Sequence, residues 1–168
     1  MSKHTPKTFQ ELKWLVDDES VYLGDIDTSA ITDMSYLFER SARTDFSGIE
    51  SWDVSNVVDM NYMFRMCYSF NYDISSWNVS KVRYMAFMFF KCHSFNQPLD
   101  TWDVSNAHNM SFMLADCYNF EQSLYEWKIP IKTVTNNMLL HCDKIKDFPA
   151  DWIESFEELR SGELCEKL

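Results

Sequence analysis

Four cysteines recur at intervals of 25 residues, at Cys67, Cys92, Cys117 and Cys142. Thiolates are favoured zinc ligands, but a zinc site needs four ligands that converge on one metal ion, at about 2.3 Å. Residues at one fixed interval of a repeat form a line instead, and helices of adjacent units would lie roughly 8 to 10 Å apart, too far for a disulfide. The spacing therefore predicts a column of buried free thiols, with no metal and no cofactor.

Other side chains that could carry catalysis do not form a recognisable set. Three serines share one column of the repeat and three histidines fall in different columns, without a shared spacing to an acid or a nucleophile: Ser55, Ser80 and Ser105, and His93, His108 and His141. A nucleophile needs a base and an orienting group within reach. We therefore expect no enzyme, and a small hydrolase is the least favoured alternative.

The whole chain is organised by the same 25-residue interval. Tryptophans recur at Trp52, Trp77, Trp102, Trp127 and Trp152, and a methionine column follows them. Five units then occupy residues 26–151, with an N-terminal cap at 1–25 and a C-terminal cap at 152–168. A fixed period of this length is typical of a single repeat domain in which each unit buries its apolar side against its neighbours.

The spacing inside a unit predicts one short helix and one short strand. Apolar residues from Val57 to Cys67 follow a three- and four-residue spacing, which is typical of a helix, and Ser55 or Asn56 precedes them as a candidate N-cap. Around Trp77 and Val79 the period is two, which indicates a strand. We therefore expect strand-helix coils stacked with a parallel ladder of strands.

Both ends of the chain carry helix-capping signals. Thr8 with Glu11, and Asp151 with Glu154, have the spacing of a capping box ahead of apolar residues. We interpret both segments as helices that shield the first and last coil.

Asparagines mark one turn of the unit. Asn71 and Asn96 follow Phe70 and Phe95. Asparagine side chains readily bind backbone groups at turns. We expect these two to bind the backbone of the next unit.

The second unit reads W-D-V-S-N-V-V-D-M-N-Y-M-F-R-M-C-Y-S-F-N from Trp52. This motif, W-D-V-S-N-V-x-x-M-x-x-M-F-x-x-C-x-x-F-N, resembles the BspA-like branch of the leucine-rich repeat proteins, found mostly in bacteria. The resemblance implies an α/β fold, a right-handed leucine-rich-repeat-like solenoid of about five coils. It also implies a role in adhesion or partner binding, commonly at a bacterial surface.

Charge and hydropathy restrict the partners. The chain has 26 acidic and 15 basic side chains, for a net charge of -11. This charge repels phosphate backbones, so we expect no nucleic acid. No run approaches the roughly 18 apolar residues of a membrane span, so we expect no membrane insertion. No signal peptide is visible, which predicts a cytoplasmic protein as written, whereas the resemblance implies a secreted or cell-surface one.

One aromatic column is the first candidate for a binding site. If the stripe from Val57 to Cys67 faces inward, position 62 projects toward solvent. This column and one nearby ring form an aromatic ridge: Tyr36, Tyr62, Phe87, Phe112 and Phe90. Exposed apolar patches often mark interfaces. The alternative is that the rings lean sideways and pack between adjacent helices.

The predicted strand face is the second candidate. It carries Asp53, Asn78 and Asp103, and leucine-rich repeat proteins generally bind on their strand face. We expect a non-enzymatic binding module that presents a rigid acidic surface to a protein, from a host or a bacterium, or to a second copy of the chain. The alternative is a structural or self-associating scaffold without a dedicated ligand.

Overall fold

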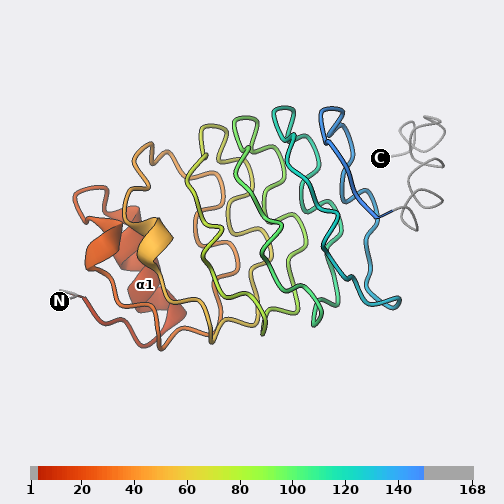
Figure 1. Ribbon diagram of the computed structural model, residues 1–168. Coiled ribbons are helices and arrows are strands. Elements are labelled where there is room, and N and C mark those ends of the chain that lie inside the picture. The colour runs from red at the N-terminus through yellow and green to blue at the C-terminus, as the bar shows by residue number, and fades with distance from the viewer. Residues whose placement is uncertain (1–3, 150–168) are drawn as a thin grey trace.

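The structure, a computed structural model, describes residues 4–149 of the chain. Figure 1 shows similar circuits of chain side by side in sequence order, with α1 at the N-terminal end. The regular elements are α1 (Phe9–Asp17) and the short 3-10 helices η1 (Leu23–Asp25) and η2 (Ile49–Ser51). The other residues described form turns, extended segments and isolated parallel bridges.

The predicted fold class is wrong. Within residues 4–149 the repeat units contain neither the α-helix expected between Val57 and Cys67 nor the strand expected around Trp77. Parallel bridges do link the units, but they join other residues: Asp33, Asp59, Tyr84, Asn109 and Val134. The chain is therefore not a leucine-rich-repeat solenoid of strand-helix coils.

Consecutive turns explain why the apolar spacing resembles that of a helix. The N–H of Met63 donates to the carbonyl of Met60 at 3.2 Å, and the N–H of Cys67 donates to that of Phe64 at 2.9 Å. A turn closed between residues i and i+3 returns the chain to the same side every three residues. Buried residues at intervals of three and four thus fit a series of turns as well as a helix.

The remaining N–H groups of these turns connect neighbouring units. In the second unit (52–76), the N–H groups of alternate residues donate to carbonyls of the third unit (77–101), and not to the carbonyl four residues earlier as they would in a helix. The N–O distances are 2.8 to 2.9 Å for the four bonds: Met60 to Tyr84, Tyr62 to Ala86, Phe64 to Met88, and Met66 to Phe90. The same four bonds join every successive pair of units from 26–51 to 127–149. The units are therefore in backbone contact, closer than the helix-to-helix spacing expected from the sequence.

Two positions in each unit have a left-handed backbone. Tyr62 and Met66 have φ of 62° and 61°, and the equivalent residues of the other units repeat this conformation. A left-handed backbone costs an L-residue about 1 to 2 kcal/mol and cannot belong to an α-helix. The bonds to the next unit and the packing of the side chains must offset this cost.

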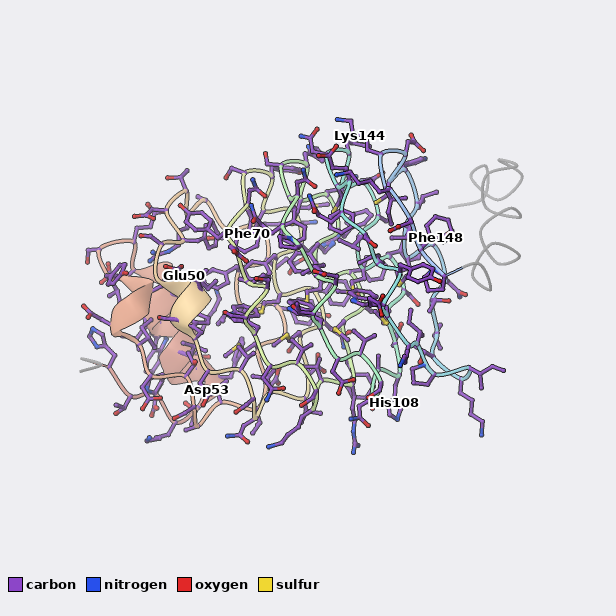
Figure 2. All side chains as sticks on the ribbon, viewed as in Figure 1. Glu50, Asp53, Phe70, His108, Lys144 and Phe148 are labelled. Carbon is purple, nitrogen blue, oxygen red and sulfur yellow. The ribbon has the colours of Figure 1, made fainter. Side chains whose placement is uncertain are left out.

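Rows of equivalent side chains fill the interior. Phe64 stacks between Phe38 and Phe89, with ring centroids 5.5 and 5.6 Å apart. The indole N–H of Trp77 donates to the carbonyl of Ile49, 28 residues earlier, at 3.1 Å, and those of Trp102 and Trp127 donate at the same interval, whereas that of Trp52 donates to Leu23 of the N-terminal cap. In Figure 2 Phe70 lies inside the stack and Lys144 at its edge.

The N-terminal helix begins where the capping signal predicts. Thr8 is the N-cap of α1, and its hydroxyl accepts from the N–H of Glu11 at 3.2 Å. The predicted C-terminal helix, opened by Asp151 and Glu154, lies outside the described residues.

The asparagine prediction is confirmed. The side-chain oxygen of Asn71 accepts from the N–H of Asn96 at 2.9 Å, and that of Asn96 accepts from the N–H of Glu121 at 3.0 Å. Each asparagine therefore ties its turn to the next unit.

Replacing Trp77 by alanine should destabilise the protein by roughly 3 to 5 kcal/mol, because a buried ring and its hydrogen bond to Ile49 are lost. Urea unfolding followed by circular dichroism measures the change. The matched control is Trp14→Ala, since Trp14 is 67% exposed and should cost little. Equal effects of the two substitutions would contradict the assignment of the tryptophan column to the core.

Substitutions at Arg40 should follow the demands of a left-handed backbone. Arg40 is exposed and has a φ of 54°. Arg40→Val should destabilise by about 1 to 3 kcal/mol more than Arg40→Asn, because asparagine tolerates positive φ and β-branched residues do not. Thermal unfolding of both variants measures the difference. Thr32→Val, at an exposed site without positive φ, is the control, and equal stability of the two Arg40 variants would argue against this conformation.

Candidate functional site

The aromatic ridge is a continuous stack of rings. Tyr36, Tyr62, Phe87 and Phe112 occupy equivalent positions in four successive units, and all four have positive φ. Their centroids are 4.6, 4.9 and 4.7 Å apart in chain order, with planes within 10° of parallel. Because the units are joined by backbone hydrogen bonds, one ring per unit is enough to build this stack. The fifth unit has Asn137 at the same position, so the stack ends there.

The stack leaves one side of the rings accessible. Tyr36 is 48% exposed, and Tyr62, Phe87 and Phe112 are half-buried. The faces of the inner rings are covered by their neighbours, so the accessible parts are mainly ring edges. Both sequence interpretations thus describe part of the geometry, since the rings pack against adjacent units and still reach solvent. Whether the ridge binds a partner stays a prediction.

Phe90 and two cations flank the ridge. Phe90 lies edge-on to Phe87 and Phe112, with centroids 5.5 and 6.4 Å apart. The guanidinium of Arg65 lies 5.8 Å from the Tyr62 centroid and 5.7 Å from that of Phe90, and the amine of Lys91 lies 5.1 Å from Phe90. These distances permit cation–π attraction. The ridge is therefore a mixed aromatic and cationic surface on an acidic protein.

Arg65 is held in place by an acidic partner. Its guanidinium forms an ion pair with Glu39 of the preceding unit. Its buried Nε has no hydrogen-bond partner in residues 4–149. Arg65 thus orders the border of the ridge across two units.

The second candidate surface consists of residues that build turns. Asp53, Asn78 and Asp103 are exposed, and the side chain of each accepts from the backbone N–H of the serine two residues later, at 2.9, 3.2 and 3.0 Å. Hydrogen bonds from the Ser55 hydroxyl and N–H lower the pKa of Asp53, and those from Ser105 lower the pKa of Asp103. The local role of these side chains is to fix the turn, and no strand lies beneath them.

The cysteine column is buried, as predicted. The thiols of Cys67, Cys92, Cys117 and Cys142 each donate to a backbone carbonyl of the preceding unit, at 2.9 to 3.1 Å. Burial raises the pKa of Cys67 and of Cys142 to about 12 and raises the pKa of the other two well above the ordinary value. Neutral thiols are poor nucleophiles and poor metal ligands.

One histidine does have an acid partner, contrary to the sequence interpretation. The Nδ1 of His141 lies 2.6 Å from a carboxylate oxygen of Asp116, a buried residue with positive φ. The hydroxyl of Tyr118 lies 3.4 Å from the same oxygen. His141 and Asp116 are 25 residues apart, so they are separated by the repeat interval that the sequence already showed. The pair joins the fourth and fifth units.

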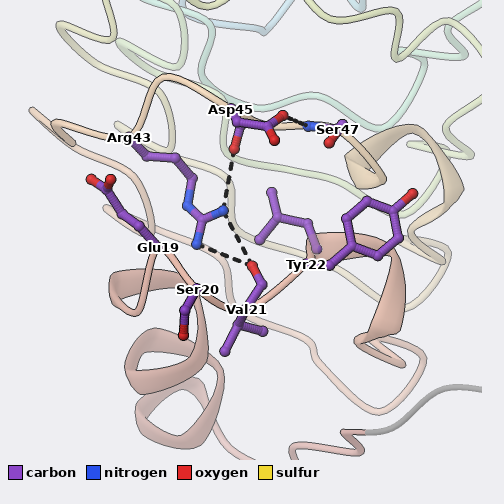
Figure 3. A pocket seen from close by; sticks show the side chains of 8 residues that line it. Glu19, Ser20, Val21, Tyr22, Arg43, Asp45 and Ser47 are labelled. Carbon is purple, nitrogen blue, oxygen red and sulfur yellow. Dashed lines mark hydrogen bonds between the residues drawn. The ribbon is translucent and has the colours of Figure 1, made fainter.

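Arg43 was missed because a single arginine in a loop gives no periodic signal. Its side chain is almost fully buried and donates to the backbone carbonyls of Val16, Asp18, Val21 and Asp45, at 2.7 to 3.3 Å. Figure 3 shows the guanidinium between Val21 and Asp45, at a cavity of about 140 Å³. Arg43 thus fastens the end of α1 and the loop after it to the first unit.

The chain belongs to a family described as "Mycoplasma protein of unknown function, DUF285", whose model matches residues 7–127 and 32–152. This match fits the expected BspA-like repeat family in a loose sense, and it does not confirm that the repeats are leucine-rich repeats. Comparisons with curated proteins and with solved structures give no match. In the part of the chain that the structure describes, no helix is long and apolar enough to cross a membrane.

The thiol column should make stability depend on alkaline pH. The Cys67 pKa rises from 9.0 to about 12 on folding, so its contribution is complete below pH 9 and is lost as the pH rises toward 12. The free energy of unfolding of Cys67→Ala should therefore fall less steeply over this range, by about 1 kcal/mol per pH unit. Urea titrations at a series of pH values measure both slopes. Identical slopes would contradict the burial of this thiol.

Proposed function

We propose that this protein is a non-enzymatic binding module that presents a rigid repeat surface to a protein partner. The observation that carries the proposal is the continuous stack of Tyr36, Tyr62, Phe87 and Phe112, which reaches solvent on one side. Clustered aromatic side chains with arginine are typical of the residues that dominate binding energy in protein interfaces. The family description leaves the function open, so binding and adhesion rest on this surface.

The backbone supports a binding role because it orders the surface in advance. Each ring is fixed by a neighbour on at least one face and by hydrogen bonds between units on its own backbone, such as that from Tyr62 to Ala86 at 2.9 Å. Ordering side chains on association costs about 0.5 to 1.5 kcal/mol for each side chain immobilised. A ridge that is already ordered avoids most of this cost.

Charge indicates the kind of partner. The net charge of -11 favours a partner that is cationic overall. The ridge itself presents ring edges, which carry partial positive charge, beside Arg65 and Lys91. We therefore propose a cationic protein that places apolar, aromatic or carbonyl groups on the ridge. A second copy of the chain is the alternative partner, and a scaffold that only self-associates would use the same surface.

Asparagine substitutions in the ridge test the proposal with little disturbance of the backbone. The fifth unit already has an asparagine in this column, Asn137, with φ of 54°. The double variant Tyr62→Asn, Phe87→Asn should weaken partner binding at least about 100-fold, as loss of two hot-spot rings predicts. Tyr125→Asn is the control, because Tyr125 is 61% exposed and lies outside the ridge.

The measurement has three parts. A pull-down from the native cell with mass spectrometry identifies the partner, titration by biolayer interferometry gives its Kd for each variant, and light scattering reports self-association. Circular dichroism checks that the double variant stays folded. Unchanged Kd in the folded double variant would refute the ridge, and loss of binding in Asp53→Asn, Asp103→Asn would assign the site to the second surface.

A further inference from the structure

The four hydrogen bonds that the turn segment of each unit makes with the next unit all point the same way. In the fourth unit (102–126), the N–H groups of Met110, Phe112, Leu114 and Asp116 donate to carbonyls of the fifth unit, at 2.7 to 3.0 Å. The carbonyls in these bonds always belong to the later unit. At these four positions the C-terminal face of a unit thus offers donors and the N-terminal face of the next unit offers acceptors, whereas the residue just before the turn, such as Val134, donates backward to the preceding unit.

Within residues 4–149, the corresponding turn donors of the fifth unit have no partner. The equivalent N–H groups belong to Thr135, Asn137, Leu139 and His141, and none of them has an acceptor within residues 4–149. All four residues are at least partly exposed. Because this row holds only donors, it cannot pair with the same row of a second copy. It needs a segment that offers carbonyl oxygens at alternate residues.

The surroundings of the row are basic, in contrast to the whole chain. Residues 127–149 contain Lys128, Lys132, Lys144 and Lys146 but only two acids, Asp143 and Asp147. All four lysines are exposed, and the side chain of Ile131 is fully exposed beside them. The fifth unit therefore has the charge that attracts an acidic segment.

We propose that the chain's own residues 151–168 bind this donor row. They lie outside the described residues, so the proposal rests on their sequence, and it replaces the capping helix that Asp151 and Glu154 led us to expect there. They contain six acidic and two basic side chains, for a net charge of -4. The 25-residue interval places Trp152 in the tryptophan column and Gly162 in the column of Asn137, where the backbone is left-handed. Glycine is the residue best suited to that conformation.

The register of the earlier units specifies the contacts. Donors of the fourth unit bind carbonyls 24 residues later, so under this proposal the same register assigns the carbonyls of Leu159, Ser161, Glu163 and Cys165 to the row. The covalent link between the fifth unit and this segment gives it a high effective concentration, which a separate partner lacks.

Amide hydrogen exchange of the full-length chain, followed by nuclear magnetic resonance, tests the proposal. The amides of Asn137, Leu139 and His141 should exchange at least about 100-fold more slowly than unprotected peptide amides. Gly162→Val should remove most of this protection, because valine opposes positive φ, whereas the neighbouring Ser161→Val should not. The amides of Phe112 and Leu114 are internal references and should stay protected in both variants.

Three results would overturn the proposal: wild-type amides that exchange at the unprotected rate, protection that survives Gly162→Val, and protection that increases with protein concentration, which would indicate a second copy. If Gly162→Val also exposes the reference amides, the double variant Glu157→Lys, Glu158→Lys decides whether the proposal holds. With the references intact, faster exchange of the three amides in that variant supports the proposal, and unchanged exchange overturns it.

Discussion

The backbone hydrogen bonds between successive units are the interaction on which the other features depend. Each of the first four units contributes four N–H groups at alternate residues to the next, so the register between these units is fixed along the whole turn segment. Once the register is fixed, residues 25 apart lie beside each other, and the sequence period becomes rows of phenylalanines, tryptophans and thiols. The core, the ridge and the asparagine contacts all follow from this arrangement.

The same bonds require an unusual backbone. To direct alternate N–H groups toward the next unit, the chain uses a left-handed conformation at two positions in each unit. Bulky residues such as Tyr62 and Phe87 occupy one of these two positions. Stacked aromatic pairs contribute about 0.5 to 1.5 kcal/mol each beyond burial, which is comparable to the cost of positive φ. Aromatic side chains at this position therefore help to offset the strain as well as forming the ridge.

The sequence was sufficient for the period, the core columns, α1 and the asparagine contacts, because each depends on which residues lie beside each other or on a local cap. It was not sufficient for secondary structure. Apolar residues at Val57, Met60, Met63, Phe64 and Cys67 satisfy a helix and a series of turns equally well, and no glycine marks the positive φ at Tyr62 or Met66. Arg43 could not have been found, since its acceptors are backbone carbonyls, which are the same in every residue.

The indole and thiol donors and the N–H groups of the turns point in opposite directions along the stack. Backbone N–H groups of the turns bind the following unit, whereas the indole of Trp77 and the thiol of Cys92 bind carbonyls 28 residues earlier, those of Ile49 and Phe64. Each interior unit is thus held on both sides by different groups, and one unit cannot slide over its neighbour without losing both sets. A terminal unit loses only one set, which makes the two ends of the stack chemically different. At the N-terminal end α1 and Arg43 supply additional contacts to the first unit, and the fifth unit needs an acceptor-rich segment for the same purpose.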